Sequence, residues 1–582
     1  MRSPASFELF PDEIILCVCQ YLREADVLYS LYNLNSRLNT TITGYCRYLN
    51  LMSVSYKQFE YAVFHVLPQI GSIVRTFVLN GNWETIINTE LSSILFVSRL
   101  SSLFPNLQRL IVKWFTSERF LSFVDTLQGF SQLMELDIRF LRGNTAGLLL
   151  QKILSANIHF KKILSANNSQ LSIVSFDQDS VDLDISDEIN MISYPNIQEL
   201  IINLTFSKLI PCLFVLIPNV HRLHLNIDEL SSDSKSKLID SNLSSLVYLT
   251  IFQLRSINLF WTFDEIAYLL KAMPSLQRLG LDMRTDDKRL VTEKDIMTIL
   301  PASLSKIDFF IRYYFSKSKS DVNEEHTFSS THIPVACLLD EPRHRFLIHS
   351  IPYDLNSAIL TASISRQMLS GWKYMKQIKD LYIYDITSTA EIILILQHFR
   401  RLRTLTIDAK DKSEKLIVPK ESQSIDFKLP FLKQIETSGI FELFPLLNVA
   451  PNVDYLIVYF DCLKILLDDE STCHLLQTRI VRLNIMDWID IESELLQRIS
   501  HVFCSLRHLV ITLKDATVSI DEFVLKIISL WKGKTRISID VTGVLSEEIC
   551  KNLRQWIIDH SHIKTEDSFT VEYNENWFDL WF

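Results

Sequence analysis

Glycine is scarce in this sequence. The 582 residues include only 11 glycines, whereas roughly 7% is typical of proteins. Neither of the glycine-rich patterns of nucleotide-binding proteins, G-x-G-x-x-G and G-x-x-x-x-G-K-[S/T], occurs in the sequence. The metalloprotease pattern H-E-x-x-H and the hydrolase pattern G-x-S-x-G do not occur either. The sequence therefore predicts a protein that is not an enzyme and that has no cofactor, no metal site and no catalytic residues.

Paired cysteines and a basic stripe are also missing. The nine cysteines are odd in number and form no C-x-x-C pair, which argues against a secreted disulfide framework. The net charge is −10, and Lys and Arg are scattered among Asp and Glu. A nucleic-acid-binding protein would concentrate basic residues on one face, so we expect no nucleic-acid partner.

Long apolar runs are absent as well. The most apolar segment, residues 201–220, contains Lys208, Pro211 and Pro218 and is not an uninterrupted membrane span. The acidic residues Asp12 and Glu13 near the start of the sequence are untypical of a signal peptide. We therefore expect a soluble protein without a membrane partner, in the cytoplasm or the nucleus.

An internal repeat runs through most of the sequence. The six-residue pattern apolar-x-x-apolar-x-apolar recurs a dozen times, and contiguous copies are spaced by 23 to 30 residues. This spacing matches the leucine-rich repeat, in which each unit contributes one short strand and one helix. Because side chains alternate along a strand, the last two apolar positions share one face, and neighbouring units stack that face into a continuous core. The copies start at residues 107, 133, 197, 220, 246, 276, 304, 378, 402, 453, 480 and 506, and a weaker copy starts at residue 74.

Proline divides the repeats in the same way. Seven of the 16 prolines stand at or just before the start of a repeat strand, as in FPNL at 104–107 and IPNV at 217–220. Proline disfavours the helical conformation of the preceding residue and cannot continue a helix, so it marks the corner between helix and strand. The fold predicted is α/β: a short N-terminal three-helix domain followed by an irregular leucine-rich-repeat solenoid, which is a curved parallel sheet with outer helices.

The expected boundaries follow from these patterns. We assign residues 5–50 to the helical domain, 51–72 to a linker helix and 73–582 to the solenoid. The solenoid pattern is interrupted at about 312–372, where a polar run at 316–331 precedes an extended segment, RFLIHSI. The aromatic tail at 568–582 is predicted to cap the last repeat, with a short helical turn that carries Trp577 and Trp581.

The strand residues between the core positions should line the concave side, which is the usual binding surface of a solenoid. Tyrosine is frequent among these residues in the C-terminal half, and tyrosine is enriched at protein-binding hot spots. We therefore expect a protein substrate to bind there. The candidate substrate-binding residues are Arg222, His224, Tyr248, Phe252, Asp380, Tyr382, Tyr384, Tyr455 and Tyr459.

The first fifty residues have a different pattern. Pro11, Asp12 and Glu13 are favourable at a helix N-terminus, and apolar residues then follow at helical spacing. Further helices are predicted over 25–34 and 35–49. About 45 residues in three helices bury little by themselves, so their surplus apolar surface should contact the repeats or another protein.

The stretch FPDEIILCVCQYLREADVLYSLYNLNSRLN resembles the F-box, whose pattern opens L-P-x-E, continues with an apolar helix ending in Y-L and then has D-L-L. Phe10 replaces the first Leu, and the tryptophan that commonly follows the arginine near the end of the motif, here Arg37, is absent. The resemblance implies a substrate receptor of an SCF-type cullin–RING ubiquitin ligase, which binds an adaptor subunit and, through it, the cullin. The expected adaptor-binding residues are Phe10, Pro11, Ile14, Ile15, Val18, Leu22, Val27, Leu28 and Leu31.

A second interpretation remains open. The N-terminal helices would then only cap the solenoid, and the protein would be a protein-binding scaffold without a ligase.

Overall fold

The computed structural model describes residues 10–582, apart from residues 23, 52–53, 55, 81–99, 116, 142–159, 179, 184, 186–192, 228–237, 241, 316–333, 341–342, 368–374, 413–414, 417–426, 490–492, 532–536, 565–566, 568 and 575. The polar run predicted at 316–331 therefore lies outside the described residues.

Two long sheets form the solenoid. The first has twelve strands: β1 (Tyr48–Asn50), β2 (Thr76–Asn80), β3 (Arg109–Lys113), β4 (Glu135–Arg139), β5 (Ile173–Phe176), β6 (Glu199–Leu204), β7 (Arg222–Ile227), β8 (Ile251–Phe260), β9 (Arg278–Thr285), β10 (Lys306–Tyr314), β12 (Arg345–Ser350) and β11 (Val335–Asp340). The second has ten: β13 (Ser357–Thr361), β14 (Asp380–Ile386), β15 (Thr404–Ala409), β17 (Gln434–Ser438), β19 (Tyr455–Tyr459), β20 (Arg482–Trp488), β21 (His508–Leu513), β22 (Ser538–Thr542), β24 (Trp577–Trp581) and β23 (Thr570–Asn574). A small two-stranded sheet pairs β16 (Lys415–Leu416) with β18 (Ile440–Phe441).

Both sheets have the same plan. Strands β1 to β10 and β13 to β22 pair in parallel, and each parallel run ends in an antiparallel hairpin, β12–β11 or β24–β23. The extended segment predicted over RFLIHSI is β12. The hairpins supply hydrogen-bond partners to the last parallel strands, which would otherwise present open sheet edges.

The repeat motif forms the strands and the core as its spacing predicts. In the copy at 107–112, the three apolar positions Leu107, Leu110 and Val112 are all buried. Strand β7 alternates strictly between exposed or half-buried residues and buried ones. The apolar side chains gather in two cores, one for each sheet, because stacked repeats bury a common apolar face.

Helices connect successive strands. The N-terminal helices are α1 (Asp12–Cys19), α2 (Glu24–Leu31), α3 (Ser36–Tyr45), α4 (Tyr56–Tyr61), the π-helical η2 (Ala62–Val66), α5 (Leu67–Ile70) and the 3-10 helix η3 (Gly71–Ile73). The first half of the solenoid contains α7 (Leu100–Leu103), α8 (Ser117–Asp125), α9 (Phe160–Leu164), α10 (Ala166–Ser169), η6 (Ser207–Leu209), α11 (Ile210–Leu216), η7 (Leu238–Asp240), α12 (Phe263–Lys271), η8 (Lys288–Val291) and α13 (Glu293–Ile299). The second half contains α14 (Ala362–Gln367), α15 (Thr389–Leu396), α16 (Phe444–Val449), α17 (Phe460–Asp468), α18 (Glu470–Arg479), α19 (Ser493–Val502), α20 (Asp521–Leu530), α21 (Glu547–Cys550) and α22 (Leu553–His560).

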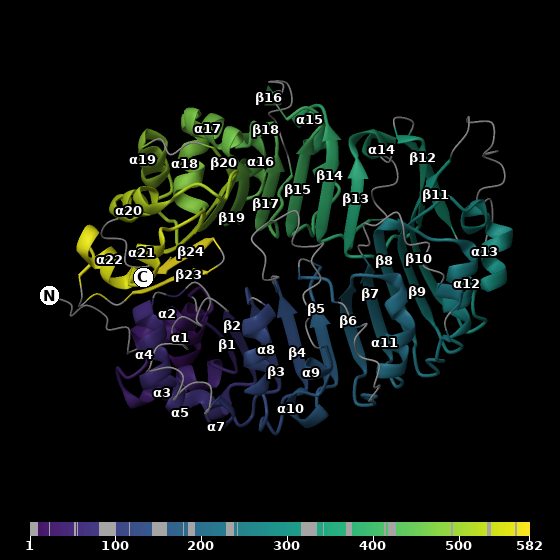
Figure 1. The fold of residues 1–582 in the computed structure, drawn as a ribbon, viewed down its shortest axis with the longest axis horizontal. Coiled ribbons are helices and arrows are strands. Elements are labelled where there is room, and N and C mark those ends of the chain that lie inside the picture. Colours follow the sequence, from purple (N-terminus) through teal and green to yellow (C-terminus); the bar gives the residue numbers. More distant parts are fainter. Residues whose placement is uncertain are drawn as a thin grey trace.

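The two halves of the solenoid face each other. Figure 1 shows the strands of the first half in the lower row and those of the second half in the upper row, with helices such as α10 and α17 on the outer sides. The chain turns at the right, and the C-terminal hairpin returns to the N-terminal helices at the left (Figure 1). The Nε1 of Trp581 donates a hydrogen bond of 2.9 Å to the backbone oxygen of Val54. The centre of the Trp581 indole also lies 5.9 Å from the centre of the Phe59 side-chain ring. These contacts join the two ends of the solenoid, which is therefore a closed ring.

Two sequence-based predictions are wrong here. Trp577 and Trp581 lie in strand β24 and not in a helical turn, because the tail pairs with β22 and β23. The repeat copy placed at 246–251 is shifted by three residues. Phe252 pairs with Leu223 of β7, so Leu249, Phe252 and Leu254 hold the core positions.

Candidate functional site

Helix α1 has one buried and one exposed apolar face. Ile15 and Cys19 are fully buried in the first core. Four exposed apolar residues lie within this helix or next to its ends, and we name them the α1 stripe: Phe10, Ile14, Val18 and Leu22, with exposed fractions of 42, 46, 38 and 42%. Ile14 and Val18 are four apart within α1 and share one helix face, whereas Phe10 precedes the helix and Leu22 follows it. An exposed apolar strip of this kind is typical of a protein-interaction site.

The other expected adaptor-binding residues divide into two groups. Pro11 is exposed beside the α1 stripe, and Leu31 is half-buried and packs against the first core. Ile15, Val27 and Leu28 are 0% exposed, so their assignment to a docking surface is wrong. Ile15 lies in α1, which packs against α3, whereas Val27 and Leu28 lie in α2, which packs against α3, α4 and β1.

A polar contact fixes the start of α1. Arg37 of α3 forms an ion pair of 2.7 Å with Asp12 and donates a hydrogen bond of 2.6 Å to the backbone oxygen of Phe10. Helix α3 itself is capped by Asn35, whose side chain accepts a hydrogen bond from the backbone N–H of Leu38. These contacts hold the first residue of the α1 stripe against α3.

The concave face is lined by the strand residues that alternate with the core. Arg222, His224, Asp380, Tyr382 and Tyr384 are all exposed or half-buried there, as the alternation predicts. Phe252 is 1% exposed in the first core and its assignment to this face is wrong. Tyr248 is 53% exposed but precedes β8, so it lies beside the concave strands and not within them.

A cavity of about 340 Å³ lies between the two halves of the ring. The first half contributes Asp182, Asn203 and Arg255 to its wall, and the second half contributes Asp380, Tyr382 and Glu436 among others. A cavity of this size holds one or two side chains of a bound partner. The structure therefore brings Asp380 and Tyr382 together in one site, and it adds residues of the first half that the sequence did not indicate.

Burial controls the charge of two predicted residues. Burial, followed by the positive charges of Arg222 and Arg278, lowers the pKa of His224 to about 4. The imidazole is therefore neutral near pH 7 and accepts a hydrogen bond of 3.2 Å from Nε of Arg222. Burial also raises the pKa of Tyr382 to about 12, with the nearby carboxylates of Asp408 and Glu436 adding to the effect. Tyr382 thus stays protonated and presents a hydrogen-bond donor beside two acidic groups.

The two remaining tyrosines of β19 are partly covered. Tyr455 is 7% exposed, and the guanidinium of Arg482 lies 4.6 Å from its ring centre. Tyr459 is half-buried, with the ammonium of Lys412 at 5.4 Å from its ring centre. Because Tyr455 is buried, its assignment to the binding surface is wrong.

Tyr384 belongs to a polar junction between the two sheets that sequence reasoning missed. Arg345 of β12 is 2% exposed and pairs with Asp340 at 2.8 Å, and it also donates hydrogen bonds to the hydroxyl groups of Tyr314 and Tyr384. Arg343 stacks 4.1 Å from the ring centre of Tyr384 and pairs with Asp385 at 2.6 Å. Tyr384 therefore joins the first sheet to the second.

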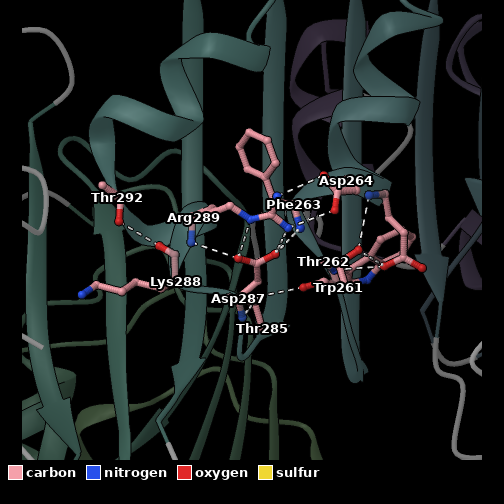
Figure 2. A network of polar contacts seen from close by, with 10 residues as sticks. Trp261, Thr262, Phe263, Asp264, Thr285, Asp287, Lys288, Arg289 and Thr292 are labelled. Atoms are coloured by element: carbon pink, nitrogen blue, oxygen red, sulfur yellow. Dashed lines mark hydrogen bonds and ion pairs between the residues drawn. The ribbon is translucent and has the colours of Figure 1, made fainter. Parts of the chain in front are cut away.

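A second polar network ties neighbouring repeats together at the carboxyl ends of β8 and β9 (Figure 2). The carboxylate of Asp287 accepts hydrogen bonds from the backbone N–H of Phe263 and from Arg289, and Arg289 also reaches Asp264 at 3.0 Å. Thr262 and Glu265 form a capping box at the start of α12. Burial alone would raise the pKa of Asp287, but the hydrogen bonds from Arg289 and from the backbone of Phe263 lower it below its usual value. The network has a structural role, because it fixes one repeat against the next.

Other kinds of site are not found in the described part of the chain. No group of three or more His, Cys, Asp or Glu side chains is arranged to hold a metal ion among the described residues. Within the same residues, no helix is both long and apolar enough to cross a membrane.

Comparison with known proteins adds little to this geometry. No protein-family model and no curated protein matches the chain. Solved structures do match, among them a leucine-rich-repeat protein of Leptospira interrogans, with 13% sequence identity and a TM-score of 0.21 over 79% of this chain and 91% of that one. A TM-score of 0.21 is too low to assign the fold, so the fold class of this protein is assigned from its own repeats. The parallel strands, outer helices and buried repeat positions are those of an α/β solenoid of the leucine-rich-repeat type.

Proposed function

We propose that this protein is the substrate-recognition subunit of an SCF-type cullin–RING ubiquitin ligase. The N-terminal helices bind the adaptor subunit, and through it the cullin, while the ring holds a target protein. In this role the chain positions its target and carries out no chemistry itself.

The observation that carries the proposal is the α1 stripe. Phe10, Ile14, Val18 and Leu22 remain about two-fifths exposed although the opposite face of the same helix is fully buried. A helix that only capped the solenoid would need its buried face alone. The stripe belongs to the stretch that resembles the F-box, which supports an adaptor subunit as its partner. Covering roughly 200 Å² of apolar area there contributes about 5 kcal/mol before the costs of association.

The target-binding part of the proposal is supported by the cavity between the two halves. Its wall combines Tyr382, which is 37% exposed, with the carboxylates of Asp380 and Glu436. Aromatic and charged groups that converge in a concave site are typical of binding sites. We propose that a side chain of the target enters this cavity.

A non-ligase scaffold is the second candidate. The burial of Ile15, Val27 and Leu28 in the first core favours it, since a cap buries its apolar side chains in this way. The two functions differ only in whether the α1 stripe has a partner.

Co-expression of the chain with the adaptor subunit separates them. Under the ligase proposal the adaptor co-purifies with the wild-type chain and is lost from Ile14→Asp/Leu22→Asp, because two charges enter an apolar interface. Met134 is 51% exposed on the solenoid, so Met134→Asp is the matched control and should retain the adaptor. Failure of the wild-type chain to retain the adaptor would favour the scaffold.

A further inference from the structure

The second sheet forms one wall of the cavity between the two halves, and its side chains lie there in regular rows. Asp380 of β14 and Thr404 of β15 are partners in register. In the next row Tyr382 of β14, Thr406 of β15 and Glu436 of β17 are partners across three strands. The residues that alternate with these along the strands are buried in the second core. The five side chains therefore point away from that core, towards the cavity that they line.

The wall of this cavity carries more acidic than basic side chains. Asp380 and Glu436 come from the second half, and Asp182 comes from the first. Arg255 is the one basic residue that lines the cavity in the described part of the chain. Its Nε lies 3.6 Å from the carboxylate of Asp282, so Arg255 is already shared with another acid. Three acidic residues against one basic residue leave two negative charges in excess in the wall.

An aromatic ring and a carboxylate share the second row. Oγ1 of Thr406 donates a hydrogen bond of 3.3 Å to Oε2 of Glu436, which places this carboxylate within the row. Tyr382 is 37% exposed, so part of its side chain is accessible from the cavity. A carboxylate attracts a cation by its charge, and the face of a phenol ring attracts it by its quadrupole. The row thus combines two groups that favour a positively charged ligand.

The position of the wall strengthens this preference. A concave surface with charges of one sign between two low-dielectric walls concentrates the electric field on a group that enters it. We infer that the target side chain that enters this cavity is basic, a lysine or an arginine. Its charged end donates hydrogen bonds to the carboxylates of Asp380 and Glu436, and its hydrocarbon part lies against the ring of Tyr382. The inference rests on the proposed function, because it names the kind of side chain that the target supplies to its binding cavity.

Binding of n-butylguanidinium and n-butylurea to the full-length chain tests this inference. Ligand-observed NMR titration at low ionic strength near pH 7.5 measures both affinities. The two probes have the same hydrocarbon chain and nearly the same shape, and they differ in charge. We expect butylguanidinium to bind about tenfold more tightly than butylurea, because hydrogen bonds between charged groups are roughly twice as strong as neutral ones.

Two substitutions locate the preference in the cavity. Glu436→Gln keeps the shape of the side chain and removes its charge, so the preference should fall to about threefold or less. The matched control is Glu548→Gln, at an exposed position of α21 outside the cavity, which should keep the preference of about tenfold. Asp380→Asn gives an independent readout if Glu436→Gln does not fold, and it should also weaken the preference.

Equal affinities of the two probes for the wild-type chain would overturn the inference. A lack of saturable butylguanidinium binding, or a preference that neither Glu436→Gln nor Asp380→Asn reduces, would overturn it as well. This experiment and the adaptor experiment fail separately. Loss of adaptor binding removes the ligase role and leaves the preference for butylguanidinium in place, whereas equal probe affinities remove the basic side chain and leave adaptor binding intact.

Discussion

The contact of Trp581 with the N-terminal helices closes the ring, and its removal should open the ring without unfolding either sheet. Trp581→Ala removes the hydrogen bond to Val54, which is worth about 1 kcal/mol, and the ring contact with Phe59, worth roughly another 1 kcal/mol. Partial burial of the indole adds about 1 kcal/mol. We therefore expect the closure to weaken by about 3 kcal/mol. Trp581→Phe keeps an aromatic ring and should lose only about 1 kcal/mol.

Hydrogen exchange at the backbone amides of α4 reports this opening, because Phe59 lies in that helix. A loss of about 3 kcal/mol should accelerate exchange there by roughly a hundredfold, and Trp581→Phe by roughly fivefold. Trp556 packs against the second core and is the matched control. Trp556→Ala should destabilise the second half while leaving α4 unchanged. Unaltered exchange in α4 of Trp581→Ala, or equal acceleration by Trp556→Ala, would refute the closed ring.

Three further predictions follow from individual residues. In urea denaturation, Phe252→Ala should lower the free energy of unfolding by about 3–5 kcal/mol, because Phe252 is 1% exposed. Tyr248→Ala should change that free energy by less than about 0.5 kcal/mol. Equal effects of the two substitutions would contradict the three-residue shift of this repeat. Arg345→Met should lower the free energy of unfolding by about 3–5 kcal/mol, because it leaves the Asp340 carboxylate buried without its charge partner. The double variant Arg345→Met/Asp340→Leu should recover much of that loss in the same assay. If the double variant recovers nothing, loss of this ion pair is not the cause. The pKa of His224 is lowered from 6.5 to about 4, so its contribution to stability is fully present above pH 6.5 and is lost as the pH falls towards 4. His224→Gln should therefore make the free energy of unfolding less dependent on pH between pH 6.5 and 4. An unchanged dependence on pH would contradict the lowered pKa.

The repeats could be predicted from the sequence because each copy of the motif determines one strand through its own residues. Contiguous copies with a narrow spacing located strands such as β3, β7 and β21, since the alternation of apolar residues decides which side faces the core. The copy near 246–254 was placed wrongly because Leu246 and Leu249 fit the pattern as well as Leu249 and Phe252 do. Only the pairing of Leu223 with Phe252 distinguishes the two registers.

The N-terminal helices show a different limit. Ile14 and Ile15 are adjacent and equally apolar, and both were predicted from the sequence to belong to the docking surface. Adjacent residues of a helix point about 100° apart, so their side chains can lie in different surroundings. The packing of α1 against α3 accompanies the burial of Ile15, whereas Ile14 remains 46% exposed.

The closed ring could not be predicted from the repeat pattern. Curvature accumulates from a small rotation per repeat, and the motif does not encode that rotation. The contact between Trp581 and Val54 spans 527 residues of sequence. The cavity between the halves, with Asp182 on one wall and Glu436 on the other, depends on the same curvature.

Adaptor binding tests the central claim most directly. Titration of the purified chain with the purified adaptor subunit measures the Kd. The proposed function predicts saturable binding that Val18→Asp weakens by at least about thirtyfold, equivalent to about 2 kcal/mol, because a charge replaces the centre of the α1 stripe. Absence of binding by the wild-type chain, or a Kd that Val18→Asp leaves unchanged, would contradict the claim that the α1 stripe is the docking surface of a ubiquitin-ligase receptor.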